Sequence, residues 1–415
     1  ATTEEDRNKY FGLTFQTLGH VIHHPQDMAQ PQHVRNDTHI MAGEDCTWYQ
    51  KPFIKLVENP SLYEQYTKTL GNLPIGKYPK VRFDSARQYW HTEDQNPGSG
   101  QGIAEFTNSN FVSAGTNFSL NQAGSVAVNA RYVLPAPDGR TTSVSIEALL
   151  KEKNQSVPCQ LNSSGQQECL SGDVVFNSTR VSDRYLNTTI DNPRASSLSI
   201  FDQDLKQRNI PTVYQNDPVN DPTNVTVEYR KFSLNRFNFD AAHGFLLNRA
   251  VAYSAGLIDY FFRGRLEIQD AGYTDTGVSL RIKNAIDPQT EPVWANEVVK
   301  AGGGLIVAVD YEVPDTQAPN GKRREYKNSW PPVTLTEDIK PGMSSAGHYS
   351  FTLPAIPDDA TDVRFRLIFR GRLGKEDGAV AVGAFKPMSG FVVAPNYVPT
   401  DGKPNENKKD EPRLI

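Results

Sequence analysis

The chain has 415 residues, which is more than one hydrophobic core usually serves, so two or three domains are expected. Hydrophobic residues make up 37% of it and charged residues 22%, with a formal net charge of -5, as in a globular protein that folds in water. Nucleic-acid-binding proteins usually carry a basic excess. This charge therefore argues against a nucleic-acid partner.

Residues 5–30 are predicted to be helical, because apolar side chains recur there at helical spacing: Phe11, Phe15, Leu18 and Ile22. Pro25 has no N–H to bond to the carbonyl of residue 21, so a kink or a fresh helix start is expected inside this stretch. Shorter helices are predicted at 60–70 and 82–93. We interpret 1–120 as a helical region.

Residues 121–235 are predicted to form a β-rich insertion. Apolar and polar residues alternate at 125–134 and 141–150 around a PAPDG turn, which is typical of a β-hairpin. Further along, Cys159 and Cys169 bracket a loop of turn-forming residues, and we interpret them as a loop-closing disulfide, with two free thiols as the alternative. A disulfide implies an oxidising compartment, so the protein is expected to be secreted, extracellular or periplasmic.

The most apolar long stretch is 245–262, and it carries Arg249 and Asp259 in its interior. Charges are costly inside a bilayer, so we expect a buried helix here and no transmembrane segment. Residues 236–264 are interpreted as the closing helix of the helical region, with Gly264 as its C-terminal cap.

Residues 265–396 are predicted to form an antiparallel β-sandwich, because short runs with period-two alternation are separated by turn-rich segments. Residues 397–415 lack core-forming side chains, and we expect an extended tail. The predicted fold class is therefore α+β, with a helical-bundle portion, a β-rich excursion and a C-terminal antiparallel β-sandwich.

Five of the eight histidines lie within residues 18–39. His23 and Asp27 are four residues apart, so on a helix they share one face, and imidazole and carboxylate are both good zinc ligands. A turn at Pro31 would swing His33 back toward the same ion or a neighbouring one. Spacing alone leaves two interpretations open, a metal site and a polar, histidine-rich surface.

A second pair, His20 and His24, lies on another part of the helix surface, because His24 directly follows His23 and is rotated from it by about 100°, so the two pairs cannot both face inward on a regular helix. Further candidates for the site or its support are His20, Asn36, Asp37, His39 and His243. Asn36 and Asp37 would fix imidazole tautomers. His243 would reach the first helix if the two helices pack, and its alternative role is a capping or buried, hydrogen-bonded histidine.

One run of residues carries a family resemblance: His23, Asp27, Met28, Ala29, Pro31, His33, Arg35, Asn36 and Asp37. This HxxxDMAxPxH pattern followed by RND resembles the zinc-dependent phospholipase C family, which is related in fold to the S1/P1 nucleases. The resemblance covers 5–40 closely and 230–265 more loosely. It implies a helical bundle with up to three zinc ions, in which His23, Asp27 and His33 are ligands and Asp27 bridges two ions. A metal-bound water, oriented by Asp27, would then attack a phosphodiester.

The sequence departs from the family pattern, because Ala1 stands in place of an N-terminal tryptophan and the later His-x-x-x-Glu pair is missing at the expected distance. Two hypotheses stay open. The chain is a secreted zinc-dependent phospholipase C-like hydrolase, or a processed fragment of one, with an incomplete metal site and a phospholipid or phosphodiester substrate. Alternatively, it is a non-catalytic extracellular structural protein, such as a surface-layer or filament subunit, which forms homo-oligomers through its β-rich parts and C-terminal tail.

Overall fold

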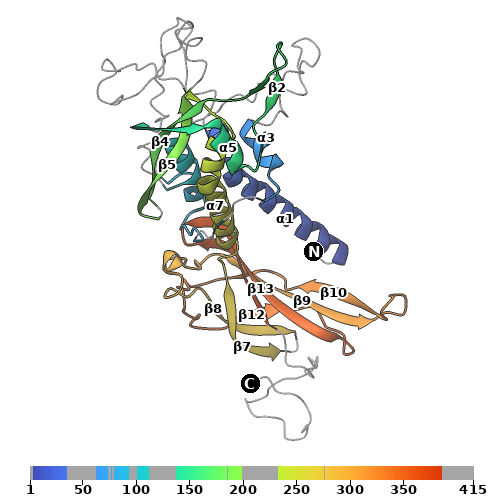
Figure 1. Cartoon of the computed structure of the whole chain (residues 1–415). Coiled ribbons are helices and arrows are strands. Elements are labelled where there is room, and N and C mark those ends of the chain that lie inside the picture. Colours follow the sequence, from blue (N-terminus) through green and yellow to red (C-terminus); the bar gives the residue numbers. More distant parts are fainter. Residues whose placement is uncertain are drawn as a thin grey trace, which may run out of the picture. The chain divides into compact units, whose positions relative to one another are not determined.

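The computed structural model describes residues 3–34, 62–72, 76, 79–92, 101–111, 137–184, 186–198, 232–274 and 276–385 (Figure 1). The fold is mixed α+β, as predicted, with helices and several small antiparallel sheets. Contacts divide the chain into two compact units. Unit 1 comprises Ala1–Val21, Arg82–Ser85 and Leu257–Ile415, and unit 2 comprises Ile22–Val81 and Ala86–Gly256. The predicted strand at 125–134 and the predicted tail at 397–415 lie outside the described residues.

Unit 1 contains two antiparallel sheets that share one hydrophobic core. The larger sheet has the order β10-β9-β13-β14 with β11 beside β9, and the smaller has the order β12-β8-β7. Their strands are β7 (Leu266–Thr274), β8 (Gly277–Asn284), β9 (Gly304–Pro314), β10 (Lys322–Asn328), β11 (Val333–Thr334), β12 (Tyr349–Thr352), β13 (Thr361–Leu373) and β14 (Glu376–Phe385). Side chains on the inner face of β9, such as Leu305, Val307 and Val309, are each 1% exposed or less, because the period of a strand places alternate residues on one face. A short 3-10 helix, η2 (Pro292–Trp294), lies between β8 and β9 in the chain.

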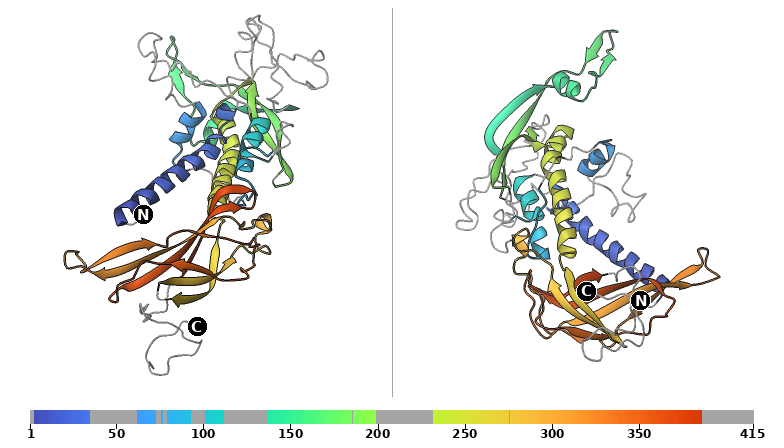
Figure 2. Two further views of the ribbon diagram at one scale, coloured as in Figure 1. Left: turned by 180° about the vertical axis from the view of Figure 1, so that it is seen from behind. Right: turned by 90° about the horizontal axis from the view of Figure 1, so that it is seen from below.

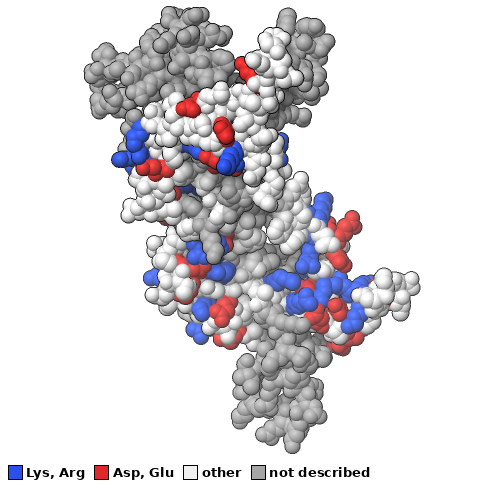
Figure 3. All heavy atoms as spheres, in the orientation of Figure 1, with Lys and Arg blue, Asp and Glu red and all other residues white. Residues whose placement is uncertain are grey.

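The outer face of the larger sheet is charged, and its charges are paired with one another. Asp310 of β9 is 2% exposed and forms ion pairs with Arg324 of β10 and Arg366 of β13. Arg324 also pairs with Asp362. Figure 3 shows acidic and basic side chains interspersed over this part of the surface. A buried carboxylate needs such partners, so this network has a structural role.

Unit 2 is built around a four-stranded sheet with the order β1-β4-β5-β6. Its elements are α2 (Pro31–Val34), α3 (Leu62–Thr69), η1 (Ala86–Tyr89), α4 (Ile103–Asn110), β1 (Pro137–Ser145), α5 (Ile146–Glu152), β2 (Cys159–Leu161), β3 (Gln167–Cys169), β4 (Asp173–Asp183), β5 (Thr188–Leu198) and β6 (Phe232–Ser233). The first turns of α7 (Arg236–Phe261) lie beside β5 in both views of Figure 2. Asn238 connects them, because its Nδ2 donates to the Arg194 carbonyl at 3.1 Å and its Oδ1 accepts from the Ser197 hydroxyl at 3.2 Å.

The predicted strand at 141–150 is wrong in its second half. Strand β1 ends at Ser145, and helix α5 begins at the next residue. The cause is local, because Oγ of Ser145 accepts a hydrogen bond from the backbone N–H of Ala148 at 3.2 Å and so caps the helix.

Pro25 does not end the first helix. Helix α1 (Glu4–Asp27) continues through Pro25, which is buried, and the fresh helix start falls at Pro31. Proline suits that position, because the first helical N–H has no partner inside the helix. The predicted helix at 82–93 is also corrected, since the described residues of this range form only the 3-10 helix η1.

A helix forms where the closing helix is predicted, as α7, but Gly264 is not its left-handed cap, because its φ is not positive. A side chain at Gly264 would place its Cβ 2.5 Å from the Val380 carbonyl oxygen, so glycine permits a close approach to β14. Within the described residues, no helix is long and apolar enough to cross a membrane.

Candidate metal and histidine sites

The last turns of α1 bring His23 and Asp27 together. Nε2 of His23 lies 3.4 Å from Oδ1 of Asp27, as their spacing of four residues on one helix predicts. The His23 side chain is 69% exposed and that of Asp27 is 20% exposed, so the pair is open to solvent on its imidazole side. His20 and His24 are both exposed on the same helix.

The short helix α2 places His33 beside a carboxylate that the sequence did not suggest. Nε2 of His33 lies 3.5 Å from Oε1 of Glu64 in α3, and both side chains are about three-quarters buried, with 23% and 22% of their surface exposed. The turn that leads into α2 is closed by the N–H of Gln30, which donates to the Asp27 carbonyl at 2.9 Å.

The described part of the chain holds no group of three His, Cys, Asp or Glu side chains arranged as metal ligands. Besides His91–Glu105 and His348–Asp270 elsewhere, it supplies two histidine–carboxylate pairs that involve the predicted ligands, His23–Asp27 and His33–Glu64. Catalytic zinc sites usually have three protein ligands, so neither pair is a complete site by itself. The other candidates near this stretch, Asn36, Asp37 and His39, lie outside the described residues.

His243 of α7 is fully buried against α3, and its tautomer follows from its neighbours. The Thr67 hydroxyl donates to the Tyr63 carbonyl at 2.7 Å and lies 2.9 Å from Nε2 of His243. Because a hydroxyl has one hydrogen, Thr67 can only accept from the imidazole. Nε2 of His243 therefore carries the proton. Nδ1 then presents a lone pair, and it is buried with no hydrogen-bond partner among the described residues.

Aromatic rings and one ion pair surround His243. Tyr66 stacks on the imidazole with a ring-centroid distance of 5.9 Å, and Tyr63 meets it edge-on at 4.9 Å. Asp240, one turn earlier on α7, pairs with Lys153 and accepts a hydrogen bond from the Tyr66 hydroxyl at 2.7 Å. This arrangement is a buried neutral histidine beside a satisfied ion pair.

The pKa values in this cluster follow from burial and from the ion pair. Burial lowers the pKa of His243, Asp240 opposes the shift, and Lys153 adds to it. Burial also lowers the pKa of Lys153, but hydrogen bonds to Asp240 and Tyr66 outweigh it, so the net pKa is raised. Burial, helped by the hydrogen bond to Asp240, raises the pKa of the Tyr66 hydroxyl. His243 is therefore neutral at pH 7, and Lys153 is charged.

Sequence reasoning missed four residues that contact the candidate histidines or their neighbours: Glu64, Tyr66, Thr67 and Lys153. Glu64, Tyr66 and Thr67 lie on α3, and Tyr66 and Thr67 follow Tyr63 by three and four residues. Residues spaced by three or four share a helix face, so this polar–aromatic face could be predicted from the sequence. The histidine that the face contacts could not be predicted.

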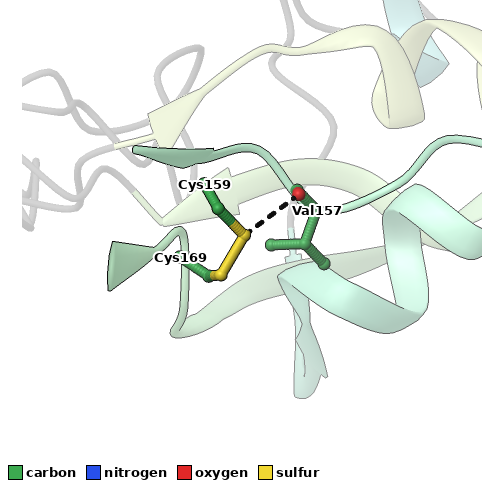
Figure 4. The surroundings of a disulfide bond; sticks show 3 residues. All are labelled: Val157, Cys159 and Cys169. Atoms are coloured by element: carbon green, nitrogen blue, oxygen red, sulfur yellow. Dashed lines mark hydrogen bonds between the residues drawn. A yellow bond between two sulfur atoms is a disulfide. The ribbon is translucent and has the colours of Figure 1, made fainter. Parts of the chain in front are cut away.

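The predicted disulfide between Cys159 and Cys169 is confirmed. The two cysteines are directly opposite each other in the hairpin of β2 and β3, whose described side chains are all exposed. Figure 4 shows the bond, with Sγ of Cys159 3.5 Å from the Val157 carbonyl oxygen. A disulfide sulfur has no hydrogen to donate, so this distance is a contact only.

No protein-family model matches this chain, and no curated protein matches it significantly. Among solved structures, a β-glucosidase from Kluyveromyces marxianus shows a partial similarity, with 14% sequence identity and a TM-score of 0.12. The similarity covers 29% of this chain and 14% of the β-glucosidase. At this level it supports neither a shared fold nor a shared activity.

Proposed function

We propose that the chain binds zinc through His23 and Asp27 and acts as a secreted phosphodiester hydrolase of the phospholipase C type. The observation that carries the proposal is the 3.4 Å approach of the His23 imidazole to the Asp27 carboxylate on one face of α1. Both are side chains that zinc prefers, and Asp27 has a second carboxylate oxygen with which to bridge. A bound zinc ion would supply an activated water and neutralise phosphoryl oxygens.

The chain's own side chains would orient this site. Glu64 would act on the third predicted ligand, His33, because its Oε1 lies 3.5 Å from Nε2 of that imidazole, and a carboxylate at that distance favours one orientation of the ring. Asp27 would hold a water for attack at phosphorus. Around the predicted ligands, the described residues provide two histidine–carboxylate pairs and no complete ligand set, so the proposal also requires further zinc ligands. The exposed Cys159–Cys169 disulfide supports an extracytoplasmic location.

The test is to count zinc in the purified full-length chain and in single variants. His23→Ala and Asp27→Asn should lose zinc together with hydrolysis of bis(p-nitrophenyl) phosphate. His24→Ala is the matched control, because His24 is the next residue of the same helix, is exposed and lies about 100° away from His23. It should keep both zinc and activity.

Two results would contradict the proposal. One is wild-type protein that takes up no zinc and hydrolyses no phosphodiester, which would favour the non-catalytic alternative. The other is equal zinc loss in His24→Ala and His23→Ala, which would indicate non-specific binding to a histidine-rich helix.

A further inference from the structure

Four phenylalanine rings form a continuous exposed patch in unit 1, which we call the phenylalanine patch: Phe11, Phe15, Phe261 and Phe262. Ring centroids are 4.7 Å apart for Phe11 and Phe15, 6.4 Å for Phe15 and Phe262, and 4.9 Å for Phe261 and Phe262. Each residue is between 46% and 61% exposed. Four half-exposed rings present on the order of 400 Å² of apolar surface, and patches of that size are often binding sites.

Two glycines on the same helix leave open space. A Cβ built at Gly12 or Gly19 would meet no described atom within 4 Å, and neither glycine has a positive φ. Each glycine destabilises a helix relative to alanine. Neither a tight contact within the described chain nor the backbone conformation requires glycine at these two positions. Small residues on a helix do allow another helix to approach closely.

The phenylalanines and Gly19 are arranged symmetrically about Phe15. Phe11 precedes Phe15 by four residues and Gly19 follows it by four, so all three fall on one side of α1. If a second α1 crosses antiparallel at Phe15, Phe11 of each helix lies over Gly19 of the other. We propose that α1 pairs in this way with α1 of a second copy of the chain, to form a two-fold symmetric dimer.

A second copy fits this surface better than a lipid bilayer does. The first turn of α1 carries Glu4, Glu5 and Asp6, which anionic lipid headgroups would repel.

The buried area determines the strength of the dimer. Two phenylalanine patches bury together about 800 Å², below the roughly 1,200 Å² of stable complexes, so the dimer should be weak and reversible. The proposal is independent of the metal site.

Sedimentation equilibrium of the full chain tests the proposal, at concentrations up to a few hundred micromolar, as weak complexes require. The wild type should show a monomer–dimer equilibrium, and Phe15→Ser should be monomeric throughout. Leu13→Ser is the matched control, because Leu13 and Phe15 are both 46% exposed, while Leu13 lies about 200° around the helix. It should dimerise as the wild type does. A monomeric wild type, or equal effects of the two substitutions, would overturn the proposal.

Gly19→Leu separates loss of the interface from loss of the fold. Leucine favours the helix and meets no described atom there, so the thermal midpoint should stay the same or rise. The added side chain occupies the place of Phe11 from the second copy, so the dimer should be lost. Retained dimerisation in Gly19→Leu would contradict the proposed register. Binding of phosphatidylglycerol vesicles by a monomeric wild type, abolished by Phe15→Ser, would show that the patch contacts lipid instead.

Discussion

The Thr67 hydroxyl and Nε2 of His243 are 2.9 Å apart, and the direction of their hydrogen bond is fixed, because Thr67 donates its hydrogen to the Tyr63 carbonyl. The contact joins α3 to α7 across a face made mostly of aromatic rings. It holds the imidazole in its Nε2-protonated tautomer. Nδ1 therefore has a lone pair inside the protein, and adding a proton there would place a charge among aromatic rings.

This geometry predicts a pH dependence of local stability in unit 2. The pKa of folded His243 is below that of an unfolded histidine, about 6.5, so the unfolded state binds the proton first. Stability is therefore complete above pH 6.5 and falls as the pH drops through the folded pKa, by up to about 1.4 kcal/mol per pH unit. Asp240 and Lys153 are the charged groups that act on it. Amide hydrogen exchange of α3 and α7 at pH 7.5, 6.5 and 5.5 measures the effect.

The variant His243→Gln should remove this slope, since an amide can still donate to Thr67 but does not titrate. His348→Gln is the control, because His348 belongs to unit 1 and is exposed beside Asp270. A slope that survives in His243→Gln would show that another group causes it.

The tautomer itself gives a second prediction. Thr67→Val should cost about 1–3 kcal/mol, because it leaves the buried Nε2–H of His243 without an acceptor. Thr67→Ser keeps the hydroxyl and should be close to the wild type. Nitrogen chemical shifts of His243 check the premise, and protonation at Nδ1 in the wild type would contradict it.

The sequence predicted the two long helices and the antiparallel strands after residue 265, and it failed at a local helix cap and where a partner comes from elsewhere in the chain. Apolar periodicity correctly indicated α1, the long apolar stretch at 245–262 correctly indicated α7, and the alternation after residue 265 correctly indicated antiparallel strands. The same pattern misled at 146–150, where the cap at Ser145 starts a helix. Local hydrogen-bond chemistry there outweighed a strand-like alternation.

In the candidate site, too, some contacts could be predicted from the sequence and others could not. The approach of His23 to Asp27 was predictable, because both residues lie on one helix and only the helix geometry matters. The contact of His33 with Glu64 joins two different helices, so its spacing in the chain did not indicate it. The environment of His243 depends on α3, α5 and α7 together, and a single sequence does not show how these elements pack.

The third prediction concerns a buried ion pair. Arg249 of α7 is 1% exposed, pairs with Asp183 of β4, and lies over the Phe106 ring with its guanidinium carbon 3.4 Å from the centroid. Arg249→Met should cost about 3–5 kcal/mol in denaturant unfolding, because it removes the buried guanidinium that pairs with the buried Asp183 carboxylate. The double variant with Asp183→Asn should recover part of the loss. Additive losses would show that the two residues act separately.

The last prediction concerns two glycines of α7, where replacement by alanine should change the stability of the protein in opposite directions. At Gly256, a Cβ would stand 1.7 Å from the Val81 carbonyl oxygen and 2.9 Å from the Tyr89 ring. Tyr89 also donates its hydroxyl to the Gly256 carbonyl at 2.8 Å, so the segment around Val81 and Tyr89 is attached to the helix at this point.

At Gly244, a Cβ would meet no described atom within 4 Å. Gly244→Ala should therefore stabilise the helix by about 0.5–1 kcal/mol, through helix propensity alone. Gly256→Ala gains the same helix propensity, but its methyl group must displace the backbone at Val81. Overpacking of this kind destabilises a protein by about 1–3 kcal/mol or more. Thermal unfolding of the two variants should shift in opposite directions. A stabilised Gly256→Ala would mean that the segment at Val81 does not approach α7 this closely, because no gain in propensity could offset that overlap.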